Sequence, residues 1–371
     1  MTIKSKSPTL LSLVILGILL SVGPSGMAVP TGDGQNGGHR NRMLLTRASG
    51  QGGHHGKHHG GRSSSPAVVP TAASVFTTLG SAGPSQWTVL EVGAGTVTQQ
   101  VDLSNPQGAI YGNVGIQQKG KLQGSGPMIY GDLYLGNNSS AAFSGSSTVT
   151  GTVHLGTAAV ASPATLTTMN DSSTQTKLNQ ARTDAIAASS MASSVASTSS
   201  LTSINLGHTS LTLGSGVYSL SSFNLDHSTL TLSGSGYYIF NITSSFVLNS
   251  GKVLLANGAT ESNILFNYTG TSAVAFSGGT GGTVPGGQDE SVLHGILLAL
   301  NAKVNLSPGL VVGEIISGQD ISIVSGAIVQ QGPVTVPDGA STFGLGVIAL
   351  SGMAAFYSFT LHSRARRLRS A

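Results

Sequence analysis

The chain has 371 residues, no cysteine and a formal net charge of +4 at pH 7, and only 8% of its residues are charged. Without cysteine it cannot be a disulfide-stapled domain, so burial and backbone hydrogen bonds must hold it together. Residues 70–333 contain six cations and eleven acids, a net charge of −5, which excludes the concentrated basic face that nucleic-acid binding needs.

Residues 1–28 have the pattern of a secretory signal peptide. Lys4 and Lys6 precede an apolar run from Leu10 to Val22, and Gly26 and Ala28 stand at the −3 and −1 positions of a cleavage site. We therefore predict an exported protein that uses the secretion machinery.

Residues 29–69 are rich in glycine, histidine, arginine and serine, and we interpret them as a flexible linker. The linker includes four closely spaced histidines: His54, His55, His58 and His59. Imidazoles bind Zn, Ni or Cu, so a weak chelating site is one interpretation. Because nothing rigid would hold these ligands, we favour a solvated tract and predict no resident metal or cofactor.

An internal repeat dominates residues 70–333. Segments 110–116, 129–135 and 149–155 align with their glycines 19 and 20 positions apart, and 208–213 aligns with 227–232 at an offset of 19. Alternating apolar residues in each copy indicate one strand per repeat. A constant period near 20 predicts a right-handed β-solenoid, whose rungs complete their core by stacking. A β-sandwich is the alternative, but it would not need a constant offset.

One stretch, about 171–196, predicts a long helix, because it lacks glycine and proline and is rich in alanine. Leu178, Ala181, Ala185, Ala188, Ala192 and Val195 lie on one helical face. Asp171 or Ser172 can cap its start. We expect this small-residue face to pack along the solenoid.

The C-terminal segment 334–371 resembles the sorting tails read by exosortases. It begins with Val336-Pro337-Asp338, continues with an apolar run at 343–361 and ends with four arginines, Arg364, Arg366, Arg367 and Arg369. The run is long enough to cross a bilayer, and the arginines should stay cytoplasmic. The resemblance implies an exosortase-type partner, a C-terminal helix held in the inner membrane at first, and a destination at the cell surface or outside the cell.

The order of segments resembles the bacterial ice-binding-like domain family over residues 70–331. A strand-rich segment is expected to begin at Ala72–Phe76, and the most specific pieces are Gly216-Val217-Tyr218 and the strand that ends Ile239-Phe240-Asn241-Ile242. The resemblance implies a discontinuous β-solenoid with a helix packed along it. Many members are exported, and not all of them bind ice.

Two kinds of surface are candidates for function. Ser210, Thr212, Thr229 and Thr231 should point outward in register, at spacings of about 6.6 Å along a strand and 4.8 Å between rungs, which suits contact with ice. Bulky or charged outward residues, Tyr111, Asn113, Tyr130, Asp132 and Tyr134, suit binding of polysaccharide or protein. We favour adhesion or scaffolding at the cell surface or in the extracellular matrix; ice binding is the alternative.

The sequence offers no catalytic site, and we predict that the protein is not an enzyme. His208 and His227 recur at the repeat spacing, which favours turn positions at rung corners. Asp226 lies beside His227, but serine is abundant and no Gly-x-Ser-x-Gly elbow occurs.

Overall fold

The computed structural model describes residues 69–93, 100–103, 108–126, 128–145, 147–163, 165–278 and 290–332. The predicted signal peptide, the histidines at 54–59, the Val336-Pro337-Asp338 motif and the apolar run 343–361 lie outside these residues, so they stay predictions. Within the described ranges, no helix combines the length and the apolar character needed to cross a membrane.

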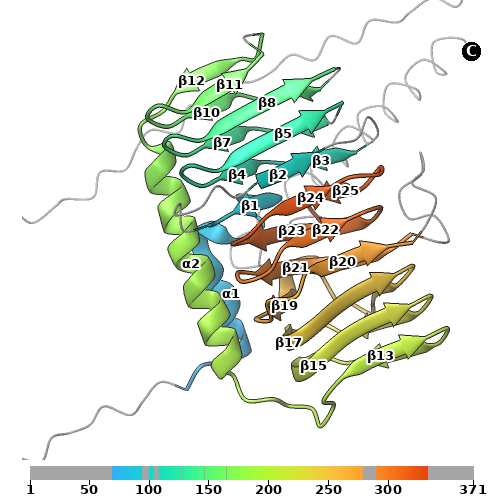
Figure 1. Ribbon diagram of the computed structural model, residues 1–371. Helices are drawn as coiled ribbons and strands as arrows, with labels where there is room; N and C mark the ends of the chain where they lie inside the picture. Colours follow the sequence, from blue (N-terminus) through green and yellow to red (C-terminus); the bar gives the residue numbers. More distant parts are fainter. Residues whose placement is uncertain are drawn as a thin grey trace, which may run out of the picture. The chain divides into compact units, whose positions relative to one another are not determined.

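The described chain is a β-solenoid in which every strand pairing is parallel, and its strands form three faces (Figure 1). We name these the long face, the helix-covered face and the third face. Four strands turn a corner and belong to two faces: β15 (Gly216–Asp226), β17 (Tyr238–Asn249), β21 (Val292–Ala299) and β23 (Leu310–Ser317).

The long face holds ten strands, stacked in this order: β13 (Ile204–Gly207), the second halves of β15 and β17, β20 (Val274–Ser277), β22 (Val304–Leu306), β24 (Ile321–Ile323), β2 (Gln100–Leu103), β5 (Lys121–Ser125), β8 (Ser140–Ser144) and β11 (Val160–Ser162). The third face holds β14 (Ser210–Leu213), β16 (Thr229–Ser233), β18 (Lys252–Ala256), the first halves of β21 and β23, β25 (Ile328–Gln330), β3 (Ala109–Tyr111), β6 (Met128–Tyr130) and β9 (Thr148–Val149). The helix-covered face holds the first halves of β15 and β17, β19 (Ile264–Tyr268), the second halves of β21 and β23, β1 (Val89–Glu91), β4 (Val114–Ile116), β7 (Leu133–Leu135), β10 (Val153–Leu155) and β12 (Thr168–Asn170).

The order of rungs does not follow the order of the chain. The first strands join the last ones, since β1 pairs with β23, β2 with β24 and β3 with β25. From this junction the N-terminal half builds rungs up to β12, the helix α2 (Thr174–Ser194) returns along the side, and β13 begins the opposite end (Figure 1). The predicted solenoid is therefore confirmed, in the discontinuous form that the family resemblance implied.

Stacked corners explain the glycine repeat found in the sequence. A Cβ on Gly131 would lie 2.4 Å from the carbonyl oxygen of Gly112, and a Cβ on Gly151 would lie 2.5 Å from that of Gly131. The same corner carries Gly295 and Gly313, both with positive φ. Because the backbones of successive rungs approach so closely at Gly131 and Gly151, a side chain at either position would clash with the rung beside it.

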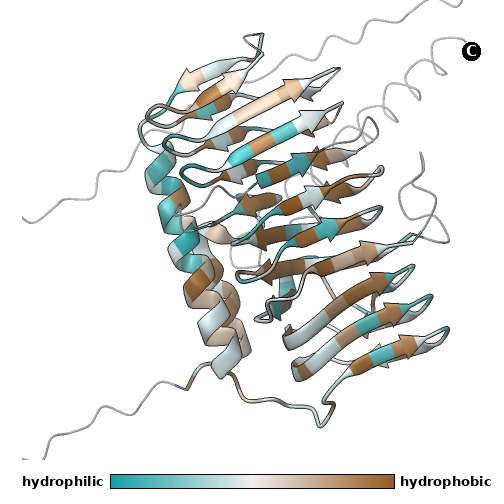
Figure 2. Cartoon of the chain, viewed as in Figure 1, coloured by the Kyte–Doolittle hydropathy of each residue, from teal (hydrophilic) through white to brown (hydrophobic). Residues whose placement is uncertain are grey.

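The interior is filled by columns of like side chains, and apolar and polar residues alternate along the strands (Figure 2). Rings stack from rung to rung in the C-terminal half; the centroids of Phe240 and Phe266 are 4.9 Å apart. Buried tyrosines keep their hydroxyls satisfied, as when Tyr238 donates to the carbonyl of Gly234 at 2.9 Å. In the N-terminal half the inward positions are aliphatic, for example Ile110, Val114 and Leu133.

The segment at Ala72, predicted to be rich in strand, is instead the helix α1 (Ala72–Leu79), followed by a short 3-10 turn, η1 (Gly80–Ala82). A capping box explains the difference: the Thr71 side chain accepts from the backbone N–H of Ser74, and the Ser74 hydroxyl accepts from the N–H of Thr71. Val75 and Leu79 of α1 are buried. The prediction treated the apolar residues as a strand and overlooked this helix-start signal.

The long predicted helix is confirmed as α2, which starts at Thr174 rather than at the expected position 171. The carboxylate of Asp171 accepts from the N–H and the hydroxyl of Ser173, and this holds Asp171 in the turn before the helix. The same hydrogen bond from the Ser173 hydroxyl lowers the pKa of Asp171. The predicted face is buried against the sheet, with Leu178, Ala181, Ala185, Ala188 and Ala192 fully inaccessible.

Two asparagines anchor α2 to the sheet. Asn241 donates to the carbonyl of Ala192 at 2.7 Å, and Asn267 donates to Asn241 at 2.8 Å and to the carbonyl of Ser189 at 3.1 Å. Asn267 is fully buried. Hydrogen bonding therefore supplements the small-residue packing and fixes the position of the helix along this face. A second 3-10 turn, η2 (Glu261–Asn263), precedes β19.

Candidate functional site

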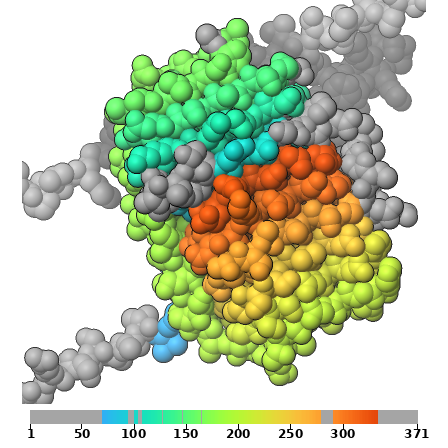
Figure 3. Space-filling model, in the orientation of Figure 1, coloured from blue at the N-terminus to red at the C-terminus, as the bar shows by residue number. Residues whose placement is uncertain are grey.

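The long face presents ten stacked parallel strands on a side of the solenoid that α1 and α2 do not cover (Figure 1). One outward position on each of its ten strands forms a central column in register: Asn205, Asn224, Val247, Ala275, Asn305, Ser322, Asp102, Gln123, Ala142 and Ser162. Nine of these ten side chains are uncharged, and none is aromatic. Figure 3 shows the rungs as successive colour bands from yellow-green through orange to teal.

Side-chain ladders hold the polar groups of this face in place. The Asn224 amide donates to the side-chain oxygen of Asn205 at 2.8 Å, and the Ser245 hydroxyl donates to that of Asn224 at 2.8 Å. Further along, Gln100 donates to Gln123 at 2.8 Å. These bonds run from rung to rung, so the outward groups repeat at the strand spacing of about 4.8 Å.

One pair of opposite charges lies beside the central column. Lys303 and Asp320 lie 2.6 Å apart across neighbouring rungs, and the N–H of Gln100 donates to Asp320 at 3.1 Å. This pair is exposed, so it adds little to stability. It places both signs of charge together near the middle of the long face, where they largely cancel.

The predicted Ser/Thr ladder lies on the third face, next to the end of the solenoid. Ser210 pairs with Thr229 and Thr212 with Thr231, all four pointing outward, while the intervening Leu230 is fully buried. On the next rung the equivalent positions are Lys252 and Leu254. The predicted register and orientation are correct, and the ladder is two rungs long.

The five residues predicted to form an adhesive surface do not lie together. Tyr111 and Tyr130 stack on the third face with centroids 4.7 Å apart. Asn113 and Asp132 lie at the corner, and each side chain accepts a hydrogen bond from the backbone of the next rung. Asn113 accepts from the N–H of Asp132 at 3.0 Å, and Asp132 accepts from the N–H of Thr152 at 2.8 Å. These two side chains therefore serve the stacking of the rungs.

Tyr134 lies on the helix-covered face. Its ring stacks on His154 at 4.2 Å and meets the edge of Trp87 at 5.1 Å, and Lys177 of α2 stands 5.6 Å from its centroid. A hollow of about 400 Å³ lies beside it, lined by Trp87, Asn113, Tyr134, Lys177 and others. Because the ring is already enclosed on both faces, it offers no free platform for a sugar.

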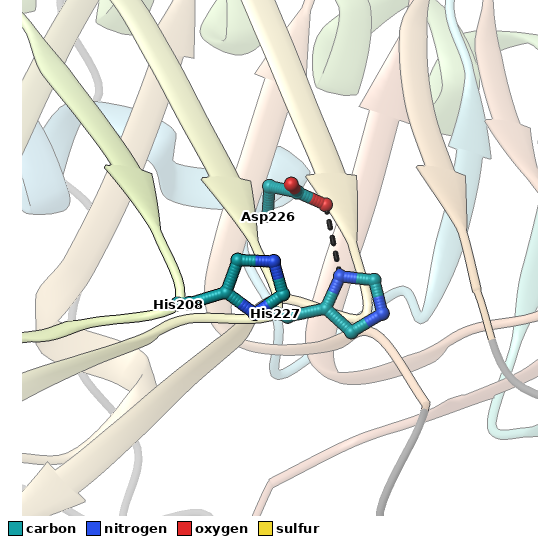
Figure 4. Close-up of side chains that lie close together, drawn as sticks. All are labelled: His208, Asp226 and His227. Atoms are coloured by element: carbon teal, nitrogen blue, oxygen red, sulfur yellow. Dashed lines mark hydrogen bonds and ion pairs between the residues drawn. The ribbon is translucent and has the colours of Figure 1, made fainter.

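A third group, which the sequence analysis assigned only to turns, lies at the corner between the long and third faces. His208 and His227 have positive φ, as expected for corner positions, and the carboxylate of Asp226 lies close to both rings and hydrogen-bonds to His227 (Figure 4). The hydrogen bond with His227 lowers the pKa of Asp226, and so does a bond from Asn249. This carboxylate is therefore ionised at neutral pH.

The central column of the long face was missed at the sequence level, although part of its signal was present. Asn205 and Asn224 stand at the same offset as His208 and His227 and extend that repeat toward the N-terminus. The other eight members belong to six residue types and recur at no constant offset in the sequence, so only the register of the strands reveals them as one column.

The comparison with known sequences identifies the family. The profile of the Ice-binding-like family matches residues 96–312, more than half of the chain. The chain belongs to the Ice-binding-like family. No curated protein sequence matches it.

Solved structures with a similar fold include three ice-binding proteins. The first, from the Antarctic ascomycete Antarctomyces psychrotrophicus, is 19% identical, with a TM-score of 0.42 over 68% of this chain and 97% of that one. LeIBP from an Arctic yeast is 18% identical, with a TM-score of 0.40 over 71% and 97%. A domain of Shewanella frigidimarina ice-binding protein 1 is 18% identical, with a TM-score of 0.40 over 72% and 99%.

Proposed function

We propose that this Ice-binding-like protein binds ice through its long face. The observation that supports this most is the central column of ten in-register positions, nine of them uncharged and none aromatic. Membership of the family makes ice the first ligand to test. The proposal places ice binding ahead of the adhesive role that the sequence favoured.

Ice presents a flat and periodic array of oxygen atoms, so its receptor needs a flat and rigid array of groups that order water. Parallel strands repeat at about 4.8 Å across rungs, and outward residues on one strand repeat at about 6.6 Å. Ten strands extend this grid over roughly 40 Å. The rung-to-rung bonds of Asn205, Asn224 and Ser245 fix their polar atoms before ice arrives, which lowers the entropic cost of binding.

The other two faces suit ice less well. The helix-covered face is closed by α1 and α2, whose buried residues pack directly on it. The third face begins with the Ser/Thr ladder, but Lys252 and Leu254 interrupt it after two rungs, and Tyr111 and Tyr130 project farther along. Only the long face continues without bulky side chains in its central column.

Export fits this function, because ice grows outside the cell. The predicted signal peptide would deliver the protein there, and the sorting tail, if processed by an exosortase-type enzyme, would display it at the cell surface. These parts of the proposal rest on the sequence patterns at the two ends of the chain.

The test compares two double variants in assays of ice shaping and thermal hysteresis. Asn305→Tyr/Ser322→Tyr places two rings on the central column, and Thr212→Tyr/Thr231→Tyr places two rings on the predicted ladder of the third face. The four positions point outward, so both variants should fold, which circular dichroism checks. We expect faceted crystals and a hysteresis gap from the unaltered protein, lost in the first variant and kept in the second.

Three other results would change the conclusion. Loss of ice shaping and hysteresis only in the Thr212/Thr231 variant would show that ice binds to the third face. Ice-binding activity in both variants would refute ice binding through the central column and through the Ser/Thr ladder. Round crystals and no gap with folded, unaltered protein would reject ice binding, and a surface scaffold or adhesin would then be the function to test.

A further inference from the structure

Two rungs at the end of the solenoid each place a histidine at the same corner. His208 lies between β13 and β14, and His227 lies between β15 and β16. The N–H of His208 donates to the carbonyl of Asp226 at 2.9 Å, and the N–H of His227 donates to that of Asn249 at 2.8 Å. The backbone thus holds both residues in the rung-to-rung ladder, and their rings stack with centroids 5.0 Å apart.

Asp226 completes a three-residue cluster (Figure 4). Its Oδ1 atom lies 3.0 Å from Nδ1 of His227, and one ligand atom from each of the three residues lies within 4.8 Å of the others. The side-chain amide of Asn249 donates to the same carboxylate at 2.6 Å and orients it. Within the described part of the chain, this is the one group of three such side chains whose ligand atoms all lie within 4.8 Å of one another.

The backbone at this corner does not require imidazole. The next two rungs have Ser250 and Gly278 at the same position, with φ of 51° and 93°. Serine and glycine therefore satisfy the same left-handed turn. The histidines on the first two rungs add two nitrogen ligands to a place where the fold alone needs none.

We propose that His208, Asp226 and His227 bind one divalent transition-metal ion, with zinc the first candidate. Two imidazoles and a carboxylate are a ligand set that suits such ions. Zinc bonds of about 2.0–2.1 Å would separate tetrahedral ligands by roughly 3.3 Å, so the donors must approach one another by up to about 1.5 Å. The side chains of Asp226 and His227 are 53% and 46% exposed, which leaves room for them to move toward the ion and for water on the ion.

Such an ion would connect the outermost rung to the rung beneath it. Among the strands that the structure describes, β13 and β14 pair on one side only, with β15 and β16. A metal ion bound by both His208 and His227 would link the two rungs and stabilise the end of the solenoid by an amount that increases with the free metal concentration. It would also lie beside the first strands of the long face, though the proposal does not depend on ice binding.

The binding test uses the full chain with His54, His55, His58 and His59 replaced by alanine, because those histidines could chelate metal themselves. Zinc is titrated into this protein by isothermal calorimetry. We expect one zinc ion per chain, lost when His208→Gln/His227→Gln is added. His294→Gln is the matched control, since His294 also pairs with a carboxylate, that of Glu261 at 3.0 Å, and should keep the ion. Binding that survives in the His208/His227 variant, or no binding in the starting protein, overturns the proposal.

A second measurement needs no altered site residue and is independent of how the variants fold. Diethyl pyrocarbonate modifies accessible histidines of the unaltered full chain with and without zinc, and mass spectrometry of peptides reads each site. We expect zinc to reduce modification of His208 and His227 together and to leave His294 unchanged. Equal modification with and without zinc, or protection of only one of the pair, contradicts a shared ion.

Discussion

Glu314 of β23 offers a quantitative test of how this fold is stabilised. The residue is fully buried, it pairs in register with Ile296, and neither carboxyl oxygen has a hydrogen-bond partner. Burial raises the pKa of Glu314 well above the usual 4.5, so the side chain is carried as the neutral acid over a wide pH range. Replacing it with methionine, which has similar length and no unsatisfied oxygen, should stabilise the protein.

The expected gain in stability equals the cost of burying the Glu314 carboxyl oxygens without hydrogen-bond partners. A buried polar group without a partner costs about 1–3 kcal/mol, so Glu314→Met should raise the free energy of unfolding by about 2 kcal/mol. For a domain of this size that corresponds to a rise in Tm of roughly 4–8 °C. Thermal unfolding followed by circular dichroism measures this directly.

The pH dependence has a fixed sign. The pKa of Glu314 is higher in the folded than in the unfolded protein. The free energy of unfolding is therefore not reduced by ionisation of Glu314 below pH 4.5, and it falls as the pH rises toward the folded-state pKa. The advantage of methionine should therefore be larger at pH 8 than at pH 5. Glu314→Gln is the control, because it removes the ionisation and keeps a polar group of the same shape.

Two results would contradict this account. If Glu314→Met melts below the unaltered protein at both pH values, the carboxyl has a stabilising partner. If the advantage of methionine shrinks between pH 5 and pH 8, the pKa of Glu314 is not raised by burial.

Two further predictions concern buried polar groups. Burial raises the pKa of Glu91 from 4.5 to about 7, although the N–H groups of Gly93 and Gln117 donate to its carboxylate. This shift in pKa implies about 3 kcal/mol of folding stability that is present below pH 4.5 and is lost as the pH rises through 7. Glu91→Gln should flatten that loss in urea unfolding between pH 5 and pH 8, and an unchanged slope would refute the assignment. Asn267→Leu should cost about 2–4 kcal/mol in the same assay, because the side-chain oxygen of Asn241 and the hydroxyl of Ser189 lose their hydrogen bonds to Asn267 beneath α2. Asn305→Leu on the exposed long face should stay within about 0.5 kcal/mol, and equal effects would contradict the anchoring role.

Much of this fold follows from local patterns in the sequence. Alternation shows which residues point inward, as for Leu230 and Leu232, and the constant offset between copies of the repeat gives the register between neighbouring rungs. The alanine face of α2 can be identified from its helical spacing. These features are predictable because each depends on residues close together in the chain or on copies of one motif.

The junction between the two halves was decided by tertiary structure. Val89 pairs with Ile315, which lies near the other end of the domain in the sequence, and no motif shared by the two strands indicates the contact. The strand predicted at Ala72 became α1 because local capping by Thr71 and burial of Val75 outweighed its apolar strand-like composition. Long-range pairing of this kind joins strands that share no motif, so local sequence patterns do not reveal it.

The functional surface divides in the same way. The sequence alone determined the Ser/Thr ladder of the third face, because its two rungs repeat the same residues, and it determined that His208 and His227 occupy turns. The tertiary structure decided that the carboxylate of Asp226 lies close to both histidines. It also decided that dissimilar residues from both halves of the chain, such as Asn224, Ser322 and Gln123, align in one column. Stacking brings residues together by their position in the rung, whatever their side chain, so a surface built from unlike residues has no repeating pattern in the sequence.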